Sequence, residues 1–346
     1  VSTDVIQPRG SGFTTAIELS DRFQPGWTSY LPDALDSVLN LNAGTIIIPY
    51  SWTFLSANTV WLAPKPGLNP TISTIQNAII DAHKKGLRVY IHATLQYDFS
   101  TDEFWNNIKN SPENWLLFNE AVTDFYNQTT LLANSLGAEG LILGDEQTSQ
   151  ILALKVSAEQ TEELNKSTSF SISDLIGAIA KIENGSKVPI FLAWRYDDLI
   201  SLDAGLLEGL DGIYLLNLGS FQDLRFDNPE TARNLIKTRL EHPMFIEMEN
   251  NETNLWVGLD FPSVQYDSEI CITYPSQCEN TSIFDFPSPM QPDLQISMEN
   301  QTNLYNAAMS EINSRPWIMG VSSRRYLIPG AYQDQSASIR GKPAAD

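Results

Sequence analysis

The sequence predicts one α/β domain over residues 1–346, a single (β/α)8 (TIM) barrel with a long loop after strand seven. Three observations predict it: eight short apolar runs, helical patterns between them, and no linker or composition break. The runs are continuously apolar, which is typical of strands buried on both faces of a parallel sheet. One barrel accommodates this alternation over the whole chain. A doubly wound open sheet is the alternative, but "SDRFQPGW" after the first run is not a glycine-rich phosphate turn.

The expected strands are, in chain order, 12–19, 44–52, 87–95, 140–144, 188–194, 212–219, 243–249 and 317–323. The seventh is the run "PMFIEME". The stretch 250–297 that follows it has no clear periodicity, so we expect an irregular excursion there.

The clearest helix begins at "SPEN", where Ser111 can cap the helix and Pro112 occupies its first position. Apolar residues then recur every three or four positions until Gly137 ends the helix. Similar spacing predicts helices within 72–83, 175–182, 228–240 and 304–312. These helices are expected to cover the outside of the sheet.

The composition restricts the partners. The 42 acidic and 21 basic residues give a formal net charge of −21, which repels nucleic acid and anionic membranes. No segment approaches the roughly 20 consecutive apolar residues of a membrane span, so we expect no membrane insertion. Self-association is left open.

Two features favour a secreted or cell-surface glycoprotein. Cys271 and Cys278 in "CITYPSQC" have no further Cys or His at metal-ligand spacing, so a loop disulfide is favoured over free thiols. A disulfide implies an oxidising compartment. Asn-x-Ser/Thr acceptor sites occur at Asn127, Asn165, Asn184, Asn251, Asn280 and Asn300.

Barrel enzymes carry their chemistry at the carboxyl ends of the strands. Two expected strands end in glutamates, the fourth at Glu146 and the seventh at Glu247. Strands four and seven lie across the mouth from one another, so the two carboxyl groups can address one bond. Retaining glycoside hydrolysis uses such a pair, roughly 5 to 5.5 Å apart, as acid/base and nucleophile. The like charge of Asp145 would favour the protonated form of its neighbour.

Further strand-end residues suit sugar binding, because aromatic rings stack on sugars and polar groups bond hydroxyls. The candidates are Trp52, His92, Asp145, Trp194, Arg195, Tyr196, Asn217, Glu249 and Tyr326. Each tryptophan has an alternative role in the core, and His92 can equally be a hydrogen-bonded core histidine. Glu249 is an alternative to Glu247, since residues two apart on a strand face the same side. No metal site and no cofactor are predicted.

Four segments resemble known proteins. They are "LNPTISTIQNAIIDAHKKGLRVYIHATL", "WLLFNEAVTDFYNQTTLLANSLGAEGLILGDE", "PMFIEMEN" and "RPWIMGVSS", with the terminal "DQSASIRGKPA". They resemble clan A glycoside hydrolase barrels, most of all the family 113 β-mannanases and their uncharacterised relatives. The resemblance implies Glu146 as the acid/base and Glu247 as the nucleophile. The chain departs from the pattern at Asp145, where the clan has Asn or Thr, and after Glu247, where relatives tend to read Ile-Gly.

The resulting hypothesis is a retaining β-glycoside hydrolase that acts through two glutamates on an oligosaccharide or polysaccharide, β-mannan being one candidate. The alternative is a catalytically inactive barrel that serves as an extracellular structural, filament, surface-layer or carbohydrate-binding glycoprotein. The departures from the family pattern at Asp145 and after Glu247 are changes that we would expect in a barrel that has lost catalysis.

Overall fold

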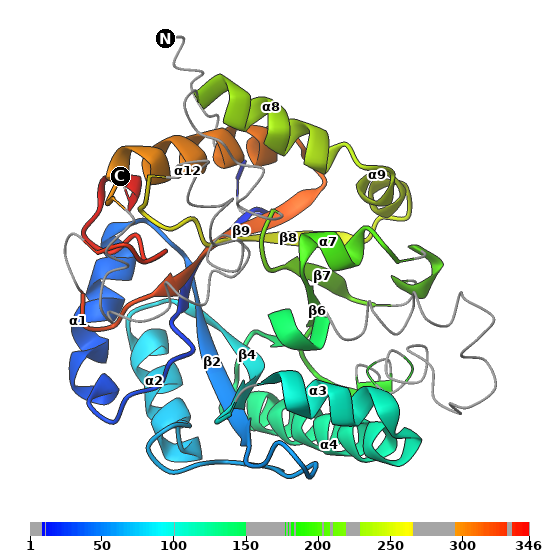
Figure 1. Cartoon of the computed structure of the whole chain (residues 1–346). Coiled ribbons are helices and arrows are strands. Elements are labelled where there is room, and N and C mark those ends of the chain that lie inside the picture. Colours follow the sequence, from blue (N-terminus) through cyan, green and yellow to red (C-terminus); the bar gives the residue numbers. More distant parts are fainter. Residues whose placement is uncertain are drawn as a thin grey trace.

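The computed structural model describes residues 9–10, 12–99, 101–149, 177, 179, 181–182, 185–202, 204–207, 210–218, 229–265, 295–330 and 334–345. Their strands form a closed parallel barrel, which confirms the predicted (β/α)8 fold (Figure 1). The eight barrel strands are β1 (Thr14–Leu19), β2 (Thr45–Phe54), β4 (Arg88–Tyr97), β5 (Gly140–Leu143), β6 (Ile190–Trp194), β7 (Gly212–Leu215), β8 (Asn254–Leu259) and β9 (Ile318–Tyr326). Strand β1 pairs with both β9 and β2, which closes the barrel. A short strand, β3 (Leu62–Ala63), pairs antiparallel with the end of β2.

Helices surround the strands (Figure 1). Those in the described parts of the chain are α1 (Trp27–Asn40), α2 (Ile72–Lys84), α3 (Thr101–Asn110), α4 (Pro112–Leu136), α7 (Tyr196–Leu199), α8 (Pro229–Leu240), α9 (Pro243–Asn250) and α12 (Met298–Asn313), with the 3-10 helices η1 (Ala204–Leu207) and η4 (Pro343–Ala345). Helix α4 has the predicted ends. The Ser111 side chain accepts from the Asn114 N–H, and Gly137 ends the helix with φ of 74°.

The predicted seventh strand was wrong, because 243–250 is helix α9. His242 caps this helix through its side chain, Pro243 occupies the first turn, and Met244, Phe245 and Met248 form the buried face. That spacing is helical, since one face of a helix repeats every three to four residues. The seventh barrel strand is β8, which lies inside the stretch predicted to be irregular.

Two hydrophobic clusters fill the molecule, one inside the barrel and a larger one between the strands and the helices. The inner cluster includes Tyr90, Ile142, Tyr214 and Trp256, which fixes the face of each strand that points inward. At Gly140 a Cβ atom would lie 2.0 Å from the Tyr90 ring, so only glycine fits there. The inner core is therefore closely packed, and chemistry is confined to the barrel ends.

Several predictions lie outside the described residues. They include the disulfide between Cys271 and Cys278, most of the helix expected within 175–182, and the acceptor sites Asn165, Asn184 and Asn280. Of the other acceptor sites, Asn127 and Asn251 are exposed, whereas the Asn300 side-chain amide donates to the Val264 carbonyl oxygen at 3.4 Å. No helix in the described part of the chain is long and apolar enough to cross a membrane.

Candidate active site at the barrel mouth

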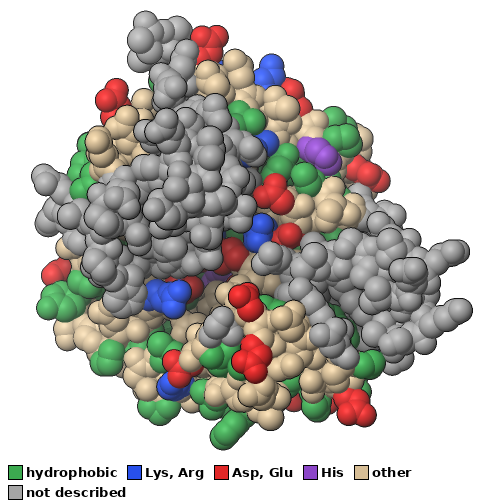
Figure 2. All heavy atoms as spheres, viewed as in Figure 1, with side chains coloured by type: hydrophobic (Ala, Val, Ile, Leu, Met, Phe, Trp, Pro, Cys, Tyr) green, Lys and Arg blue, Asp and Glu red, His purple; other side chains and the backbone are tan. Residues whose placement is uncertain are grey.

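Glu146 lies at the carboxyl-end mouth, three residues beyond the end of β5. Its Oε1 atom accepts from Arg324 Nη2 and from Arg325 Nη2, both at 2.9 Å. Both arginines come from the end of β9, and they are 5% and 9% exposed at the side chain, compared with 31% for Glu146. Glu146 is therefore the solvent-accessible member of a mostly buried ion pair. Acidic and basic side chains gather near the middle of this face (Figure 2).

The backbone of β9 is irregular where it delivers these arginines. Successive residues of a regular strand point to opposite faces, so Arg324 and Arg325 would normally diverge. Here Arg325 has a φ of 62°, and the register between β1 and β9 shifts before Tyr326. A positive φ is unfavourable for a residue with a side chain and is typical of functional sites. In this barrel it directs both guanidinium groups toward Glu146.

A second layer of polar side chains supports the arginines from inside the barrel. The Oε2 atom of Glu18, on β1, accepts from the Tyr214 hydroxyl at 2.6 Å and from Arg324 Nε at 3.0 Å. Its Oε1 lies 2.8 Å from His92 Nδ1, while His92 Nε2 lies 2.7 Å from the Gly144 carbonyl oxygen. A carbonyl can only accept, and Glu18 accepts at both oxygens, so both nitrogens of His92 donate. His92 is therefore a buried imidazolium that supports the mouth without facing it.

Asp260 completes the cluster from the residue after β8. Its Oδ2 accepts from Arg324 Nη1 at 3.3 Å and from Arg325 Nε at 3.2 Å. Burial raises the pKa of Asp260, and Arg325 and Arg324 offset part of that rise. Asp260 is 1% exposed, so it holds the arginines from beneath and has little contact with solvent.

The cluster is balanced in charge, because three carboxylates, Glu18, Glu146 and Asp260, meet three cations, His92, Arg324 and Arg325. Burial alone would raise the pKa of Glu146, but Arg324 and then Arg325 hold it well below its usual range. Water screens part of this attraction, since the side chain is 31% exposed. Glu146 is thus ionised at neutral pH.

Asp145 has a different role from the one predicted. Its carboxylate turns back and accepts from the N–H groups of Leu95, Gln147 and Thr148, which ties β4 to the first turn after β5. Burial raises the pKa of Asp145 to about 6, and the bonds from Thr148 and Leu95 limit the rise. We expected its negative charge to keep Glu146 protonated. That expectation was wrong, because two arginines lie closer to Glu146 and outweigh it.

The His92–Glu18 pair predicts a pH dependence of stability. Burial would raise the pKa of Glu18, but Arg324 and His92 lower it from 4.5 to about 2. Burial would lower the pKa of His92 from 6.5, but Glu18 raises it. The stabilisation that ionised Glu18 adds to the free energy of unfolding is thus complete above pH 4.5 and is lost as the pH falls through 2. The stabilisation that protonated His92 adds to the free energy of unfolding is complete below pH 6.5. It is lost as the pH rises through the raised pKa of His92 in the folded state.

We therefore expect His92→Gln to flatten the fall of unfolding free energy as the pH rises above 6.5. The slope should differ from the wild type by up to about 1.4 kcal/mol per pH unit, the value for one proton. Urea unfolding at a series of pH values measures it. Equal slopes for the two proteins would contradict the imidazolium assignment.

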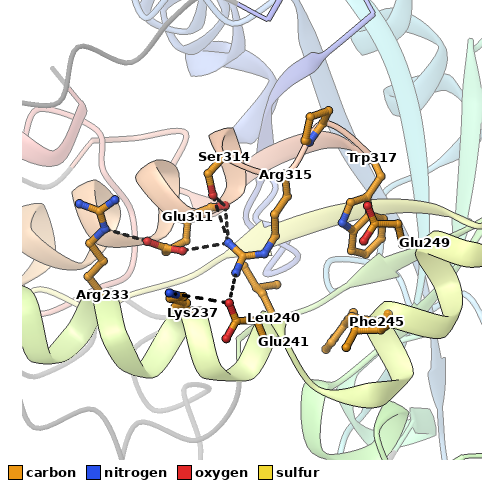
Figure 3. Close-up of a pocket in the computed structure, with 12 residues that line it drawn as sticks. Arg233, Lys237, Leu240, Glu241, Phe245, Glu249, Glu311, Ser314, Arg315 and Trp317 are labelled. Carbon is orange, nitrogen blue, oxygen red and sulfur yellow. Dashed lines mark hydrogen bonds and ion pairs between the residues drawn. The ribbon is translucent and has the colours of Figure 1, made fainter.

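Glu247 and Glu249 are not at the mouth, contrary to prediction. Both are exposed on α9, which ends four residues before β8 begins and so lies at the amino ends of the strands. Glu249 borders a cavity of about 440 Å³ between α8, α9 and α12, together with Trp317 and Arg315 (Figure 3). The placement of the nucleophile on Glu247 was therefore wrong, because its segment is a helix.

Several charged side chains in this cavity pair with one another. Glu311 accepts from Arg233 at 2.7 Å and from Arg315 at 2.9 Å, and Arg315 also lies 3.6 Å from Glu241 (Figure 3). These pairs join α8 to α12 across the surface. We interpret the cavity as a junction between helices.

The aromatic residues predicted to stack on sugars are packing residues. Trp194 and Tyr326 are 0% and 1% exposed, and Tyr196 is buried with its ring 5.9 Å from that of Phe245. Trp52 is half-buried and its ring lies 5.3 Å from that of Phe125 on α4. All four side chains belong to, or pack against, the hydrophobic cluster between the strands and the helices.

Two other predicted residues lie near the mouth. Arg195 follows β6, is half-buried and pairs with Asp198 at 3.5 Å. Asn217 lies two residues beyond β7 and is half-buried. Among the residues that the structure describes, no group of three or more His, Cys, Asp or Glu side chains is arranged to hold a metal ion.

The sequence reasoning missed Glu18 and Asp260, and it treated the arginines only as possible partners of local acids. Glu18 was visible as the single charged residue in the predicted strand "TTAIEL", which is a signal for a buried partner. Asp260 was visible as the first acid after "NLWVGL", but only once that run is recognised as a strand.

The whole chain is similar in fold to solved glycoside hydrolases. The structure of the GH113 β-mannanase AaManA from Alicyclobacillus acidocaldarius, in complex with ManMIm, aligns with a TM-score of 0.67 at 15% identity, over 98% of this chain and 97% of that one. Another GH113 β-1,4-mannanase aligns with a TM-score of 0.68 at 12% identity, over 96% of both chains. A GH5-4 broad-specificity endoglucanase from an uncultured bacterium aligns less well, with a TM-score of 0.54 at 9% identity, over 90% of this chain and 86% of that one.

No protein-family model matches the sequence, and a search of curated proteins finds no similar sequence. At these identities the structural similarity establishes the fold, a barrel of the type seen in clan A glycoside hydrolases. The activity has to be argued from the residues at the mouth.

Proposed function

We propose that the protein is a glycoside hydrolase that cleaves an oligosaccharide or polysaccharide at the barrel mouth, with Glu146 as its essential carboxylate. The observation that carries the proposal is the position of Glu146. It is an accessible carboxylate at the end of the fourth barrel strand, fixed by two arginines. The similarity in fold to β-mannanases over nearly the whole chain makes a β-mannan the first substrate to test.

The ionised state of Glu146 decides what it can contribute. Glycoside hydrolysis passes through a transition state with positive charge on the sugar ring, like an oxocarbenium ion. A fixed carboxylate beside the anomeric carbon stabilises that charge or attacks the carbon directly. Protonating the leaving group is a different task that needs the neutral acid. We therefore assign Glu146 to the anionic role.

Turnover of activated aryl glycosides tests this proposal, because their leaving groups depart without protonation. The panel should carry mannosyl, glucosyl and galactosyl groups, together with soluble β-1,4-mannan. We expect release of the aryl alcohol from at least one of these glycosides. No release from any glycoside and no cleavage of mannan would contradict hydrolysis.

A second candidate function is carbohydrate binding without hydrolysis. It is favoured by the charge balance of the cluster, in which Glu18, Glu146 and Asp260 are all matched by cations. In that case the wild-type protein would bind an oligosaccharide at the mouth and leave it intact. Binding measured by calorimetry, with products followed by chromatography, separates the two functions.

A further inference from the structure

Trp61 is an exposed aromatic residue at the carboxyl-end face. Strand β2 ends at Phe54, and the chain returns as β3 at Leu62, so the hairpin 55–61 projects beyond the end of the strand. Trp61 is 61% exposed. All eight tryptophans are among the described residues, and each of the other seven is buried or half-buried. Trp61 therefore presents the flat apolar face of an indole ring to solvent, a surface suited to stacking on a ligand.

The hairpin is held in place from both sides. At its base the Leu55 N–H donates to the Trp61 carbonyl oxygen at 3.0 Å. At its tip the Asn107 amide, on α3, donates to the Ala57 carbonyl oxygen at 3.1 Å, and Ser56 Oγ accepts from the Asn58 N–H at 3.2 Å. Trp61 is therefore presented on a preorganised turn, which lowers the entropic cost of binding.

Beneath the hairpin, Asn69 joins the neighbouring strands. Its Oδ1 accepts from the Thr53 hydroxyl at 2.9 Å and from the Lys65 N–H at 2.6 Å. Its Nδ2 donates to Ser51 Oγ at 3.0 Å. This buried amide therefore connects β2 to the segment that follows β3.

The hairpin is connected to the proposed active site through α3. Gln147, the residue after Glu146, accepts at Oε1 from Trp105 Nε1 on α3 at 3.2 Å. Asn107, two positions further along α3, contacts the hairpin. Residues two apart on a helix face nearly opposite sides. The hairpin tip and Gln147 therefore contact nearly opposite sides of α3.

We propose that Trp61 is a stacking platform for a sugar ring of a polymeric substrate, remote from the bond at Glu146. The inference rests on the proposed function and deepens it to a substrate class. Aromatic faces bind the apolar faces of sugar rings. The hairpin and Gln147 contact opposite sides of α3, so we expect only a chain of several sugars to reach both Trp61 and Glu146. Trp61 is then a determinant of specificity for long over short carbohydrates.

Binding measured in the Glu146→Gln protein tests Trp61 without turnover. The probes are a hexasaccharide and a disaccharide of β-1,4-mannose, and the variants add Trp61→Ala or Trp61→Phe. We expect Trp61→Ala to weaken hexasaccharide binding about 3- to 10-fold and to leave disaccharide binding unchanged. Trp61→Phe should retain most of the affinity. Leu131→Ala is the matched control, because Leu131 is 69% exposed on α4.

Three outcomes would overturn the proposal: unchanged hexasaccharide affinity in Trp61→Ala, equal losses for both probes, or no hexasaccharide binding at all. A change of oligomeric state in Trp61→Ala, measured by light scattering, would assign Trp61 to contact with a second copy instead. Loss of hexasaccharide affinity in Trp61→Ala without turnover of any substrate by the wild type would support the platform and contradict hydrolysis.

Discussion

Replacing Glu146 by Gln is expected to reduce hydrolysis of every substrate at least about 1000-fold, including activated aryl glycosides. The amide has nearly the same shape, but it lacks the negative charge that stabilises the sugar cation. The effect on activated substrates is diagnostic, since loss of a proton donor would leave their cleavage largely intact. Initial rates on 2,4-dinitrophenyl glycosides and on β-1,4-mannan measure it.

Glu247→Gln is the matched control, because it makes the same chemical change on the exposed face of α9. We expect its rates to stay within about twofold of wild type, as for other surface substitutions. Loss of activity in Glu247→Gln, with wild-type activity in Glu146→Gln, would return the chemistry to the residue predicted from the sequence. Retained cleavage of activated substrates by Glu146→Gln would show that Glu146 donates a proton.

Arg324→Gln is expected to destabilise the fold by about 3 to 5 kcal/mol, because it removes the central cation of a buried cluster. Arg324 contacts Glu18, Glu146 and Asp260, so its loss leaves three carboxylates facing one arginine and His92. Its stem also fills space beside Gly258, where a Cβ atom would lie 2.5 Å from Arg324 Cδ. Urea unfolding at neutral pH measures the change.

Two further variants separate charge from geometry. Arg324→Lys keeps the charge but has one nitrogen in place of three, so its stability should lie between that of the wild type and Arg324→Gln. Lys84→Gln removes an exposed partner of Asp81 and should cost less than about 0.5 kcal/mol. A loss below about 1 kcal/mol for Arg324→Gln would mean that water already solvates the cluster.

The sequence predicted those parts of the fold whose signals are local. Helix α4 has its cap, proline, apolar spacing and final glycine within one segment, and the continuous apolar runs located seven of the barrel strands. The segment 243–250 was misread because "MFIEM" is compatible with both a strand and a short helix. The preceding His-Pro pair was the overlooked helix signal, and the error placed the predicted nucleophile on a helix away from the mouth.

The charge pairing at the mouth depends on tertiary structure and could not be predicted in the same way. Position alone placed Glu146 at the end of a strand, but its ionised state depends on arginines 178 and 179 residues further along the chain. Both reach it because Arg325 adopts a positive φ, which no sequence pattern indicated. The aromatic predictions failed for a related reason. Strand-end tryptophans and tyrosines face either the mouth or the helices, and a shift of one residue exchanges the two.

A crystal structure of Glu146→Gln with a bound β-1,4-mannose hexasaccharide tests most directly where the protein acts. We predict a sugar ring within hydrogen-bonding distance of residue 146, at the carboxyl ends of the strands. Sugar bound instead between α8, α9 and α12, beside Glu249 and Trp317, would contradict a functional site at the mouth.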